Sequence, residues 1–354
     1  MRVYTRRRQQ AGYYMQDDIL SLFVWSHRPP LPRTTPTNKS TPLSIMQQNS
    51  PLTTHQLQEY ECIELVSVDD VCPSIRGLMS VESVTAIMRL LNKVALVTGS
   101  SSGIGRAIAL RYAREGAKVA CADITPTARS PVPNELDITT HDAISQEGGQ
   151  AFFLQTDVGN ASQMENAVLK TAQQFGRLDI MVNNAGVSLE SRTPARIHET
   201  TNELYDTTMR INTRSVFLGS KYAITQMLKQ DPHPSGDRGW IINLSSILGI
   251  VAATENPSYC ASKGAVSNLT RQVALDYARD RIHANAICPG YTRTAIYEET
   301  TEYMHAAADL IRRHPFNGPG LPDDIARVAV VLASEDASWM TGAVVPVDGG
   351  YTAR

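Results

Sequence analysis

The chain has 354 residues, a formal net charge of −2 and 42% hydrophobic residues, enough for one large domain or two ordinary ones. This charge gives no reason to expect a nucleic acid or an anionic membrane as a partner. The longest apolar run near the start has about seven residues, whereas a bilayer span needs about 20. Five cysteines are scattered without a CxxC pair, so no metal site or disulfide framework is indicated, and a reducing compartment such as the cytoplasm is expected.

Residues 1–87 show no sustained hydrophobic period, and prolines crowd one polar stretch between Pro29 and Pro42. Because proline lacks the backbone donor, regular structure is disfavoured there. We therefore expect an N-terminal extension at residues 1–87, disordered or dispensable, before a single catalytic domain at residues 88–354. A targeting segment, a misassigned translation start and an added cover formed by residues 57–84 are the alternatives.

From residue 88 onward, short β-rich runs alternate with segments of helical period. This alternation predicts βαβ units, and the nearly all-apolar runs are typical of strands buried on both faces. We predict an α/β fold, a Rossmann-type doubly wound parallel sheet of about seven strands. The predicted strands are residues 93–98, 118–123, 151–156, 179–183, 240–245, 282–288 and 343–347, and the predicted helices are residues 106–115, 161–175, 215–229, 258–280 and 322–334.

A glycine-rich turn follows the first predicted strand and leads into the first predicted helix. Glycines at these positions allow a tight turn and a close approach of the backbone to a pyrophosphate, which the helix N-terminus attracts. A flexible Gly/Ser loop is the alternative. The turn residues expected to bind a dinucleotide are Gly99, Ser102, Gly103, Ile104 and Gly105.

Asp123 ends the second predicted strand, 24 positions after Gly99. A carboxylate there accepts hydrogen bonds from the adenosine ribose hydroxyls and repels a 2′-phosphate, which favours NAD(H) and leaves NADP(H) possible. The loop at residues 125–137 is long and contains Arg129. An arginine there can reach a 2′-phosphate, which is why NADP(H) stays open. An ordinary turn aspartate is the alternative.

Tyr259 and Lys263 lie one helical turn apart in the predicted helix at residues 258–280. A neighbouring ammonium favours the phenolate, so this pair predicts a tyrosine whose pKa is lowered for acid–base work. Ser246 follows the predicted strand at residues 240–245, at the edge where open α/β sheets bind ligands. Taken alone, Ser246 fits a strand-terminating turn serine better than a substrate-binding one, and a chance spacing is the alternative for the Tyr259–Lys263 pair.

In combination, these motifs make residues 89–352 resemble the short-chain dehydrogenase/reductase family. The resemblance includes the glycine turn, Asp157-Val158, Asn183-Asn184-Ala185-Gly186, Asn212, Ser246, Tyr259, Lys263, Cys288-Pro289-Gly290 and Val347-Asp348-Gly349-Gly350. It implies that Tyr259 is the acid–base, that Ser246 positions the substrate oxygen, and that Lys263 holds the nicotinamide ribose and lowers the tyrosine pKa. It also implies that Asn212 holds a water connecting Lys263 to solvent.

The same resemblance assigns the remaining cofactor contacts. Asp157 and Val158 are expected beside the adenine, with Asn183 bracing the central strands. Further contacts are expected from Asn184, Ala185, Gly186, Pro289, Gly290, Thr292 and Thr294, where the family often has an aliphatic residue in place of Thr292. A homodimer or homotetramer is implied through the helices at residues 215–229 and 258–280. The lengthened turn at residues 231–239 is expected on the surface.

The function expected is an NAD(P)-dependent enzyme that moves a hydride between its cofactor and a secondary alcohol or ketone. Sugars, polyols, cyclic ketones and secondary-metabolite intermediates all fit as small-molecule substrates, and the segment at residues 293–320, with Tyr297, Tyr303, Met304 and His305, is expected to cover them. An NADPH-dependent 3-ketoacyl-carrier-protein reductase and a non-catalytic binding protein with the same fold are the alternatives.

Overall fold

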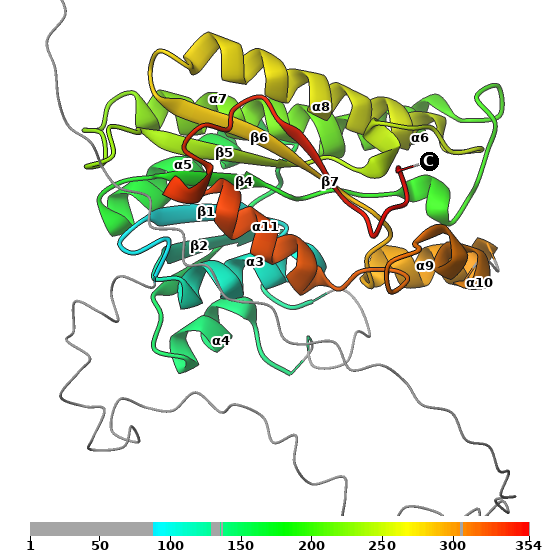
Figure 1. Ribbon diagram of the computed structural model, residues 1–354, viewed down its shortest axis with the longest axis horizontal. Helices are drawn as coiled ribbons and strands as arrows, with labels where there is room; N and C mark the ends of the chain where they lie inside the picture. Colours follow the sequence, from blue (N-terminus) through cyan, green and yellow to red (C-terminus); the bar gives the residue numbers. More distant parts are fainter. Residues whose placement is uncertain (1–87, 129–134, 136, 305–306, 354) are drawn as a thin grey trace, which may run out of the picture. The chain divides into compact units, whose positions relative to one another are not determined.

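The computed structural model describes residues 88–128, 135, 137–304 and 307–353, without the side chains of residues 302–304 and 307. The predicted extension therefore lies outside the described residues. The sheet has seven strands, all parallel, in the order β3-β2-β1-β4-β5-β6-β7 (Figure 1). The predicted doubly wound fold is confirmed. The strands are β1 (Val94–Thr98), β2 (Lys118–Asp123), β3 (Ala151–Gln155), β4 (Ile180–Asn183), β5 (Gly239–Leu244), β6 (Ile282–Pro289) and β7 (Val344–Val347).

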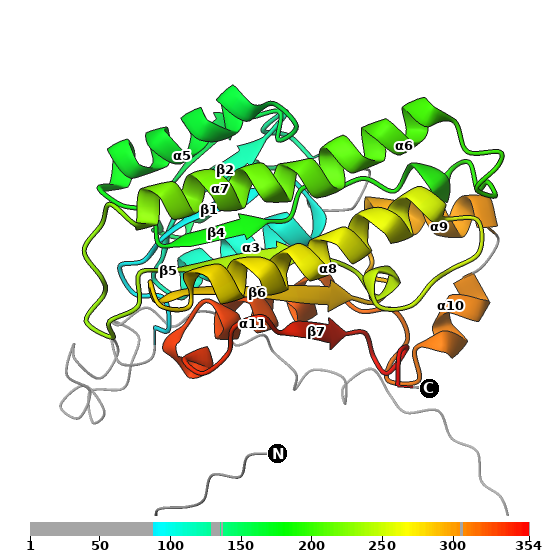
Figure 2. The same cartoon turned by 90° about the horizontal axis from the view of Figure 1, so that it is seen from above.

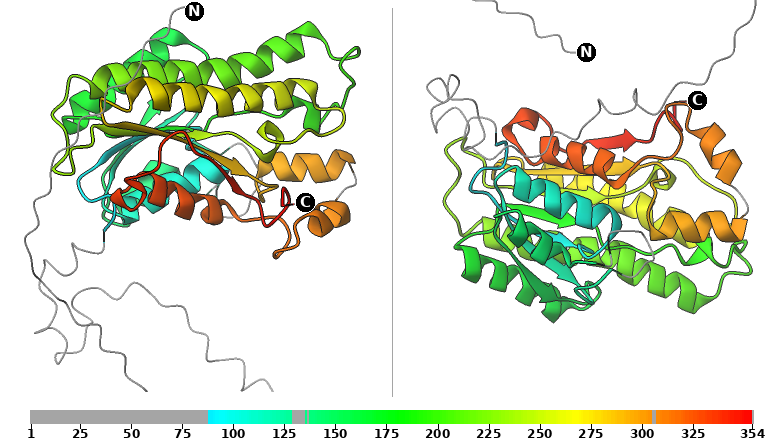
Figure 3. Two further views of the ribbon diagram at one scale, coloured as in Figure 1. Left: turned by 45° about the horizontal axis from the view of Figure 1, so that its top comes forward. Right: turned by 90° about the horizontal axis from the view of Figure 1, so that it is seen from below.

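Helices cover both faces of this sheet, as the two views of Figure 3 show. One face carries α3 (Gly103–Arg114), α4 (Thr140–Gln146) and α11 (Pro322–Leu332), and the other carries α5 (Ala161–Phe175), α7 (Ser215–Met227) and α8 (Pro257–Tyr277). Asp323 at the start of α11 accepts two hydrogen bonds of 2.7 Å from Arg111, which joins α11 to α3. The helices α6 (Asn202–Met209), α9 (Ala295–Met304) and α10 (Ala307–Arg313) complete the described set.

Four of these helices, α4, α6, α9 and α10, are absent from the predicted helices. They are short and polar, so they offer little apolar period; α4, for example, has the sequence THDAISQ. Its N-terminus is instead fixed by a cap, since the Thr139 hydroxyl accepts the amide of Asp142. Tertiary contacts and caps, rather than a hydrophobic stripe, therefore determine where these short helices form.

The strands bury both of their faces, which places a core on each side of the sheet. In β1, Ala95 and Val97 join the core under α3 and α11, while Leu96 joins the core under α5 and α7. The same alternation is seen in β5, where Trp240 and Ile241 belong to different cores. Each large apolar side chain buried in this way contributes about 1.5–3 kcal/mol relative to an exposed one.

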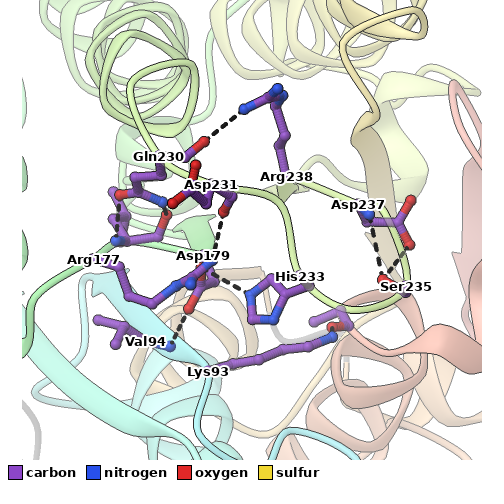
Figure 4. Close-up of polar contacts among 12 residues, drawn as sticks. Lys93, Val94, Arg177, Asp179, Gln230, Asp231, His233, Ser235, Asp237 and Arg238 are labelled. Carbon is purple, nitrogen blue, oxygen red and sulfur yellow. Dashed lines mark hydrogen bonds and ion pairs between the residues drawn. The ribbon is translucent and has the colours of Figure 1, made fainter.

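Residues 231, 232 and 234–236 of the turn before β5 are exposed, as predicted, but two other side chains of this turn reach buried groups. Its Asp237 is only 1% exposed, and the Asp237 carboxylate is 3.0 Å from Nε2 of His283. His233 of the same turn approaches the fully buried Asp179 to 2.9 Å (Figure 4). Lys93 lies 3.4 Å from the centre of the Trp240 ring. The turn therefore folds back over the amino ends of the strands, because buried carboxylates there require partners.

We expect Asp179 to contribute strongly to stability. Its carboxylate accepts the backbone amide of Val94 at 2.9 Å and the Arg177 guanidinium at 2.7 Å. Asp179→Ala leaves these buried donors without an acceptor, so the free energy of unfolding should fall by about 3–5 kcal/mol. Urea denaturation followed by circular dichroism measures this change. A loss below about 1 kcal/mol, the value of a typical exposed pair, would contradict it.

Candidate active site

The sequence-predicted site residues gather at the carboxyl ends of the parallel strands. Chain connections run from β1 to α3 on one face and from β4 towards α6 on the other, so the strand order reverses between β1 and β4. In open α/β sheets, ligands bind in the crevice at such a point. Figure 2 shows α9 and α10 at the end to which the strand arrows point. The candidate site therefore lies between the strand ends and these two helices.

The glycine turn after β1 is closely packed against the turn after β4. Gly99 and Gly103 have φ angles of 64° and 55°, which non-glycine residues rarely adopt. A Cβ atom on Gly105 would lie 2.1 Å from the Gly99 carbonyl oxygen. The Asn184 side-chain amide donates to the carbonyls of Thr98 and Gly99 at 2.9 and 3.1 Å. The predicted turn thus has a backbone cradle that fits a pyrophosphate.

Glu135 places a carboxylate against the backbone of this cradle. Its carboxylate accepts the backbone amide of Gly103, the first residue of α3, at 3.0 and 3.2 Å. Burial raises the pKa of the Glu135 carboxyl, although the Gly103 hydrogen bond opposes the rise. Sequence reasoning missed Glu135, since it lies in the long loop at residues 125–137 without any motif. Arg129 of that loop lies outside the described residues.

Asp123 stands at the mouth of the cradle, as predicted. Its two carboxylate oxygens accept the backbone amides of Ser101 and Ile124 at 3.1 and 2.7 Å. These bonds hold the carboxylate where β2 ends, beside the glycine turn. Asp157 and Val158, the residues expected beside the adenine, follow the end of β3. The Asp157 carboxylate pairs with Arg210 at 3.0 Å, and the Val158 side chain packs in the core, only 7% exposed.

Tyr259 and Lys263 lie in the first turns of α8, and Ser246 lies two residues after the end of β5, where it caps the 3₁₀ turn Ile247–Gly249. The Ser246 side chain lowers the pKa of the Tyr259 hydroxyl, although burial outweighs it. The Lys263 Nζ lies 5.7 Å from the centre of the Tyr259 ring and donates to the carbonyl of Leu244 at 2.8 Å. The structure therefore brings the predicted tyrosine, serine and lysine together at one strand end.

The electrostatics of this group differ from the sequence prediction. Burial raises the pKa of Tyr259 to about 12, and the Ser246 hydrogen bond only partly opposes this rise. Burial also lowers the pKa of Lys263 to about 8. The predicted lowering of the tyrosine pKa by Lys263 is therefore wrong for this geometry, because the ammonium bonds a backbone carbonyl and desolvation dominates.

Asn212 lies in the π-helical turn Arg210–Arg214 between α6 and α7 and is fully buried. Its side-chain amide exchanges two hydrogen bonds of 2.8 Å with the backbone of Val187 and donates to Ser262 at 3.1 Å. Single π-helical turns inside helices are common at functional sites. Here the turn fixes Asn212 between α8 and the segment after β4, beside Gly186, where a Cβ would lie 3.3 Å from Asn212 Oδ1.

The segment after β6 closes the site from the other side. Gly290 is in tight contact with Asp348, and the Thr292 hydroxyl bonds the Gly290 carbonyl at 3.1 Å. The Thr294 side chain reaches the glycine turn, since a Cβ on Gly103 would lie 3.1 Å from its methyl group. The predicted cofactor residues of this segment thus face the cradle across the crevice.

Sequence reasoning missed an aromatic group beside Tyr259. The imidazole of His314, 2% exposed, accepts the Tyr291 amide at 3.1 Å through Nε2 and bonds the Leu310 carbonyl through Nδ1. The rings of Tyr291 and Tyr351 lie 6.0 Å apart. No spacing in the sequence connects these residues, which meet only through the fold. Of the predicted cover, Tyr297 is half-buried in α9, and the side chains of Tyr303 and Met304 and all of His305 lie outside the described residues.

Among the described residues, no group of His, Cys, Asp or Glu side chains is arranged to hold a metal ion. In the same part of the chain, no helix combines the length and apolar character needed to cross a membrane.

Comparisons with known proteins agree with this geometry. The profile of the family described as Enoyl-(Acyl carrier protein) reductase matches residues 99–352. The 2-(R)-hydroxypropyl-CoM dehydrogenase of Xanthobacter autotrophicus is 34% identical over 74% of this chain and 100% of its own length.

Two solved structures have the same fold over most of their length. Levodione reductase has a TM-score of 0.67 at 32% identity and covers 75% of this chain and 99% of its own. A proposed 2-deoxy-d-gluconate 3-dehydrogenase from Agrobacterium tumefaciens with bound NADP has a TM-score of 0.64 at 31% identity, with coverages of 76% and 99%. The cradle, the Ser246–Tyr259–Lys263 group and these similarities together show that the chain belongs to the short-chain dehydrogenase/reductase family.

Proposed function

We propose that this oxidoreductase moves a hydride between NAD(H) and the carbon of a secondary alcohol or ketone. The observation that carries the proposal is the placement of Tyr259, Ser246 and Lys263 together, with the Lys263 Nζ 5.7 Å from the centre of the Tyr259 ring, at the same edge of the sheet as the pyrophosphate cradle. When bound, the nicotinamide dinucleotide supplies or accepts the hydride. The residues of the chain then have to orient the substrate and move one proton.

In ketone reduction, Tyr259 acts as the proton donor. Its raised pKa of about 12 keeps the hydroxyl protonated at neutral pH, ready to donate to the carbonyl oxygen. Ser246 donates a hydrogen bond to the same oxygen, and Lys263, fixed by the Leu244 carbonyl, binds the ribose hydroxyls of the cofactor. Asn212 supports the segment after β4 and holds the water that connects Lys263 to solvent. In alcohol oxidation the proton passes in the opposite direction, so this direction should become faster as pH rises.

Tyr259→Phe tests this assignment. The variant keeps the ring but removes the hydroxyl, so turnover should fall by about 10²–10⁴, the usual contribution of a positioned acid–base. NADH binding, measured by fluorescence titration, should stay within about twofold because the cradle is unchanged. Turnover near that of the unmodified enzyme would remove Tyr259 from the mechanism and favour the non-catalytic alternative.

The aromatic group at Tyr291 and Tyr351 supports a compact or cyclic ketone as the substrate, since ring faces pack well against flat apolar surfaces. Two of the similar proteins are named for hydroxypropyl-CoM and levodione, both carrying secondary alcohol or ketone groups. A similar protein of Thermotoga maritima, named 3-oxoacyl-[acyl-carrier-protein] reductase, favours one second candidate, a 3-ketoacyl reductase. Comparing turnover of cyclic ketones with that of 3-ketoacyl thioesters distinguishes the two.

Asp123 supports NAD(H) over NADP(H). Its carboxylate is held at the cradle by two backbone amides, where it would meet a 2′-phosphate, although one structural neighbour binds NADP. Asp123→Ser removes the charge, so NADH should bind more weakly and the preference over NADPH should narrow by about tenfold. Both dissociation constants are measured by fluorescence titration. A tenfold preference for NADPH in the unmodified enzyme would overturn the assignment.

Glu135 should weaken cofactor binding, because its carboxylate bonds the Gly103 amide that a pyrophosphate needs. Glu135→Gln removes the competing charge, and NADH affinity should rise by about three- to tenfold. In the unmodified enzyme, affinity should also rise as pH falls through the raised Glu135 pKa, because protonation discharges the carboxylate. The variant should lose this pH dependence. Equal affinity and equal pH dependence in the two proteins would show that Glu135 does not compete.

A homodimer or homotetramer formed through α7 and α8 also fits the described surface. Phe217 of α7 and Leu275 of α8 are 52% and 79% exposed, which is unusual for large apolar side chains without a partner. A groove at this face, formed by α6, the π-helical turn, α7 and α8, is lined by Asp206, Met209, Arg210, Thr213, Arg214, Phe217, Ala265 and Leu269. A second copy of the chain, packing the same faces, would cover it.

A further inference from the structure

Glu190 is a buried carboxylate next to the candidate catalytic tyrosine, outside every sequence motif. It lies in the single 3₁₀ turn Leu189–Ser191, between β4 and α6, with a relative exposure of 0%. Its Oε1 accepts the backbone amide of Ser258, and its Oε2 accepts that of Tyr259, both at 2.9 Å. Both oxygens of one carboxylate thus bind the two consecutive amides at the start of α8.

The start of α8 lacks a cap of its own, which makes this contact unusual. Asn256 precedes the helix, but its side chain accepts no amide and instead donates to the Thr254 carbonyl at 3.2 Å. Pro257 is the first helical residue and has no N–H to donate. The amides of Ser258 and Tyr259 are therefore free for an external acceptor, and a carboxylate there also matches the positive end of the helix dipole.

Burying a carboxylate is costly unless hydrogen bonds compensate. Asn256 is of a residue type that often caps a helix locally, yet here the cap comes from a residue 68 positions earlier in the chain. A local cap would only stabilise the helix. A distant one also fixes where the helix begins relative to the segment after β4, which the Asn212 side chain binds through Val187.

The turn that carries Glu190 also contacts the helix over the substrate side. The Thr300 hydroxyl of α9 donates to the Ser191 hydroxyl at 3.1 Å, and Arg192 pairs with Glu299 of α9. Ser188 and Ser191 share a further hydrogen bond of 2.6 Å. The first turn of α8 and the middle of α9 are therefore held by the same short segment.

From these contacts we propose that Glu190 is a positioning residue for Tyr259. Its carboxylate fixes the first turn of α8, and thereby the direction in which the Tyr259 hydroxyl points towards Ser246 and the substrate oxygen. The proposal rests on the proposed role of Tyr259 as the proton donor. Because a misplacement of about 1 Å can cost about 10²-fold in rate, a bond of this kind acts on turnover as well as on stability.

The first test is Glu190→Gln. The amide keeps one acceptor oxygen, but its NH₂ group faces a backbone N–H, so one of the two bonds is lost and a donor meets a donor. We expect kcat to fall by about tenfold or more. NADH affinity by fluorescence titration should change less than about twofold, because Glu190 bonds the start of α8 and not the glycine turn after β1.

A matched control separates positioning from general destabilisation. Asp179 is equally buried and also accepts a backbone amide, but it lies at the amino ends of the strands, away from the site. Asp179→Asn should lower the midpoint of urea unfolding and leave kcat within about twofold below that midpoint. An equal fall in kcat in both variants would reduce Glu190 to a structural residue and overturn the proposal.

A double-mutant cycle with Tyr259→Phe tests the route of action. If Glu190 acts through the tyrosine hydroxyl, Glu190→Gln should lower the residual single-turnover rate of Tyr259→Phe by less than about twofold. The same tenfold loss in both backgrounds would overturn the proposal while leaving the function of Tyr259 intact. A fully active Tyr259→Phe enzyme would overturn the proposed function, and this proposal with it. If Glu190→Gln does not fold, Glu190→Asp, which keeps the charge but shortens the side chain, enters the same cycle and is judged by the same outcomes.

Discussion

The hydrogen bonds between the ends of β1 and β4 are the contacts on which the rest of the site depends. The Thr98 hydroxyl donates to the Val182 carbonyl at 3.1 Å and accepts the amides of Asn184 and Ala185 at 3.0 and 3.2 Å. The chain leaves these two strands towards opposite faces of the sheet. Their turns would separate without such links, and a cradle built from both turns would lose its shape. Side-chain bonds to backbone groups thus hold the crevice at the switch point.

Buried carboxylates organise both ends of this sheet, with different consequences. At the amino ends, Asp179 and Asp237 bind cationic and imidazole groups and join loops that belong only to the scaffold. At the carboxyl ends, Glu190 binds backbone amides at the start of α8. Each buried charge is compensated, as the cost of desolvation requires. The hydrogen bonds and ion pairs of the carboxylates at the amino ends of the strands only stabilise the fold. Those of Glu190 at the carboxyl ends also place the candidate reactive groups.

Desolvation is also the main electrostatic effect at the candidate active site. It raises the pKa of Tyr259 and lowers that of Lys263, so burial disfavours the charged form of both groups. The Leu244 carbonyl accepts a hydrogen bond from the buried Lys263 ammonium, and the Ser246 side chain partly opposes the rise in the Tyr259 pKa. A protonated tyrosine in such surroundings suits proton donation to a carbonyl oxygen. The aromatic group of Tyr291, His314 and Tyr351 extends the same dry environment towards the substrate side.

Sequence alone determined the doubly wound sheet, the strand positions and the placement of Tyr259, Lys263 and Ser246 near the glycine turn. These follow from local rules, since apolar runs predict buried strands, glycines predict the cradle, and the residue after a parallel strand lies at its carboxyl end. Sequence could not determine that Glu135 reaches the cradle, that Glu190 caps α8, or that His233 and Asp237 of the turn before β5 reach buried partners. Each of these contacts joins residues at least 30 positions apart, as with Gly103 and Glu135, 32 positions apart. Their pairing depends on how helices and turns pack around the sheet. The direction of the Tyr259 pKa shift was decided in the same way, because desolvation depends on everything that surrounds the ring and not on the spacing of two residues.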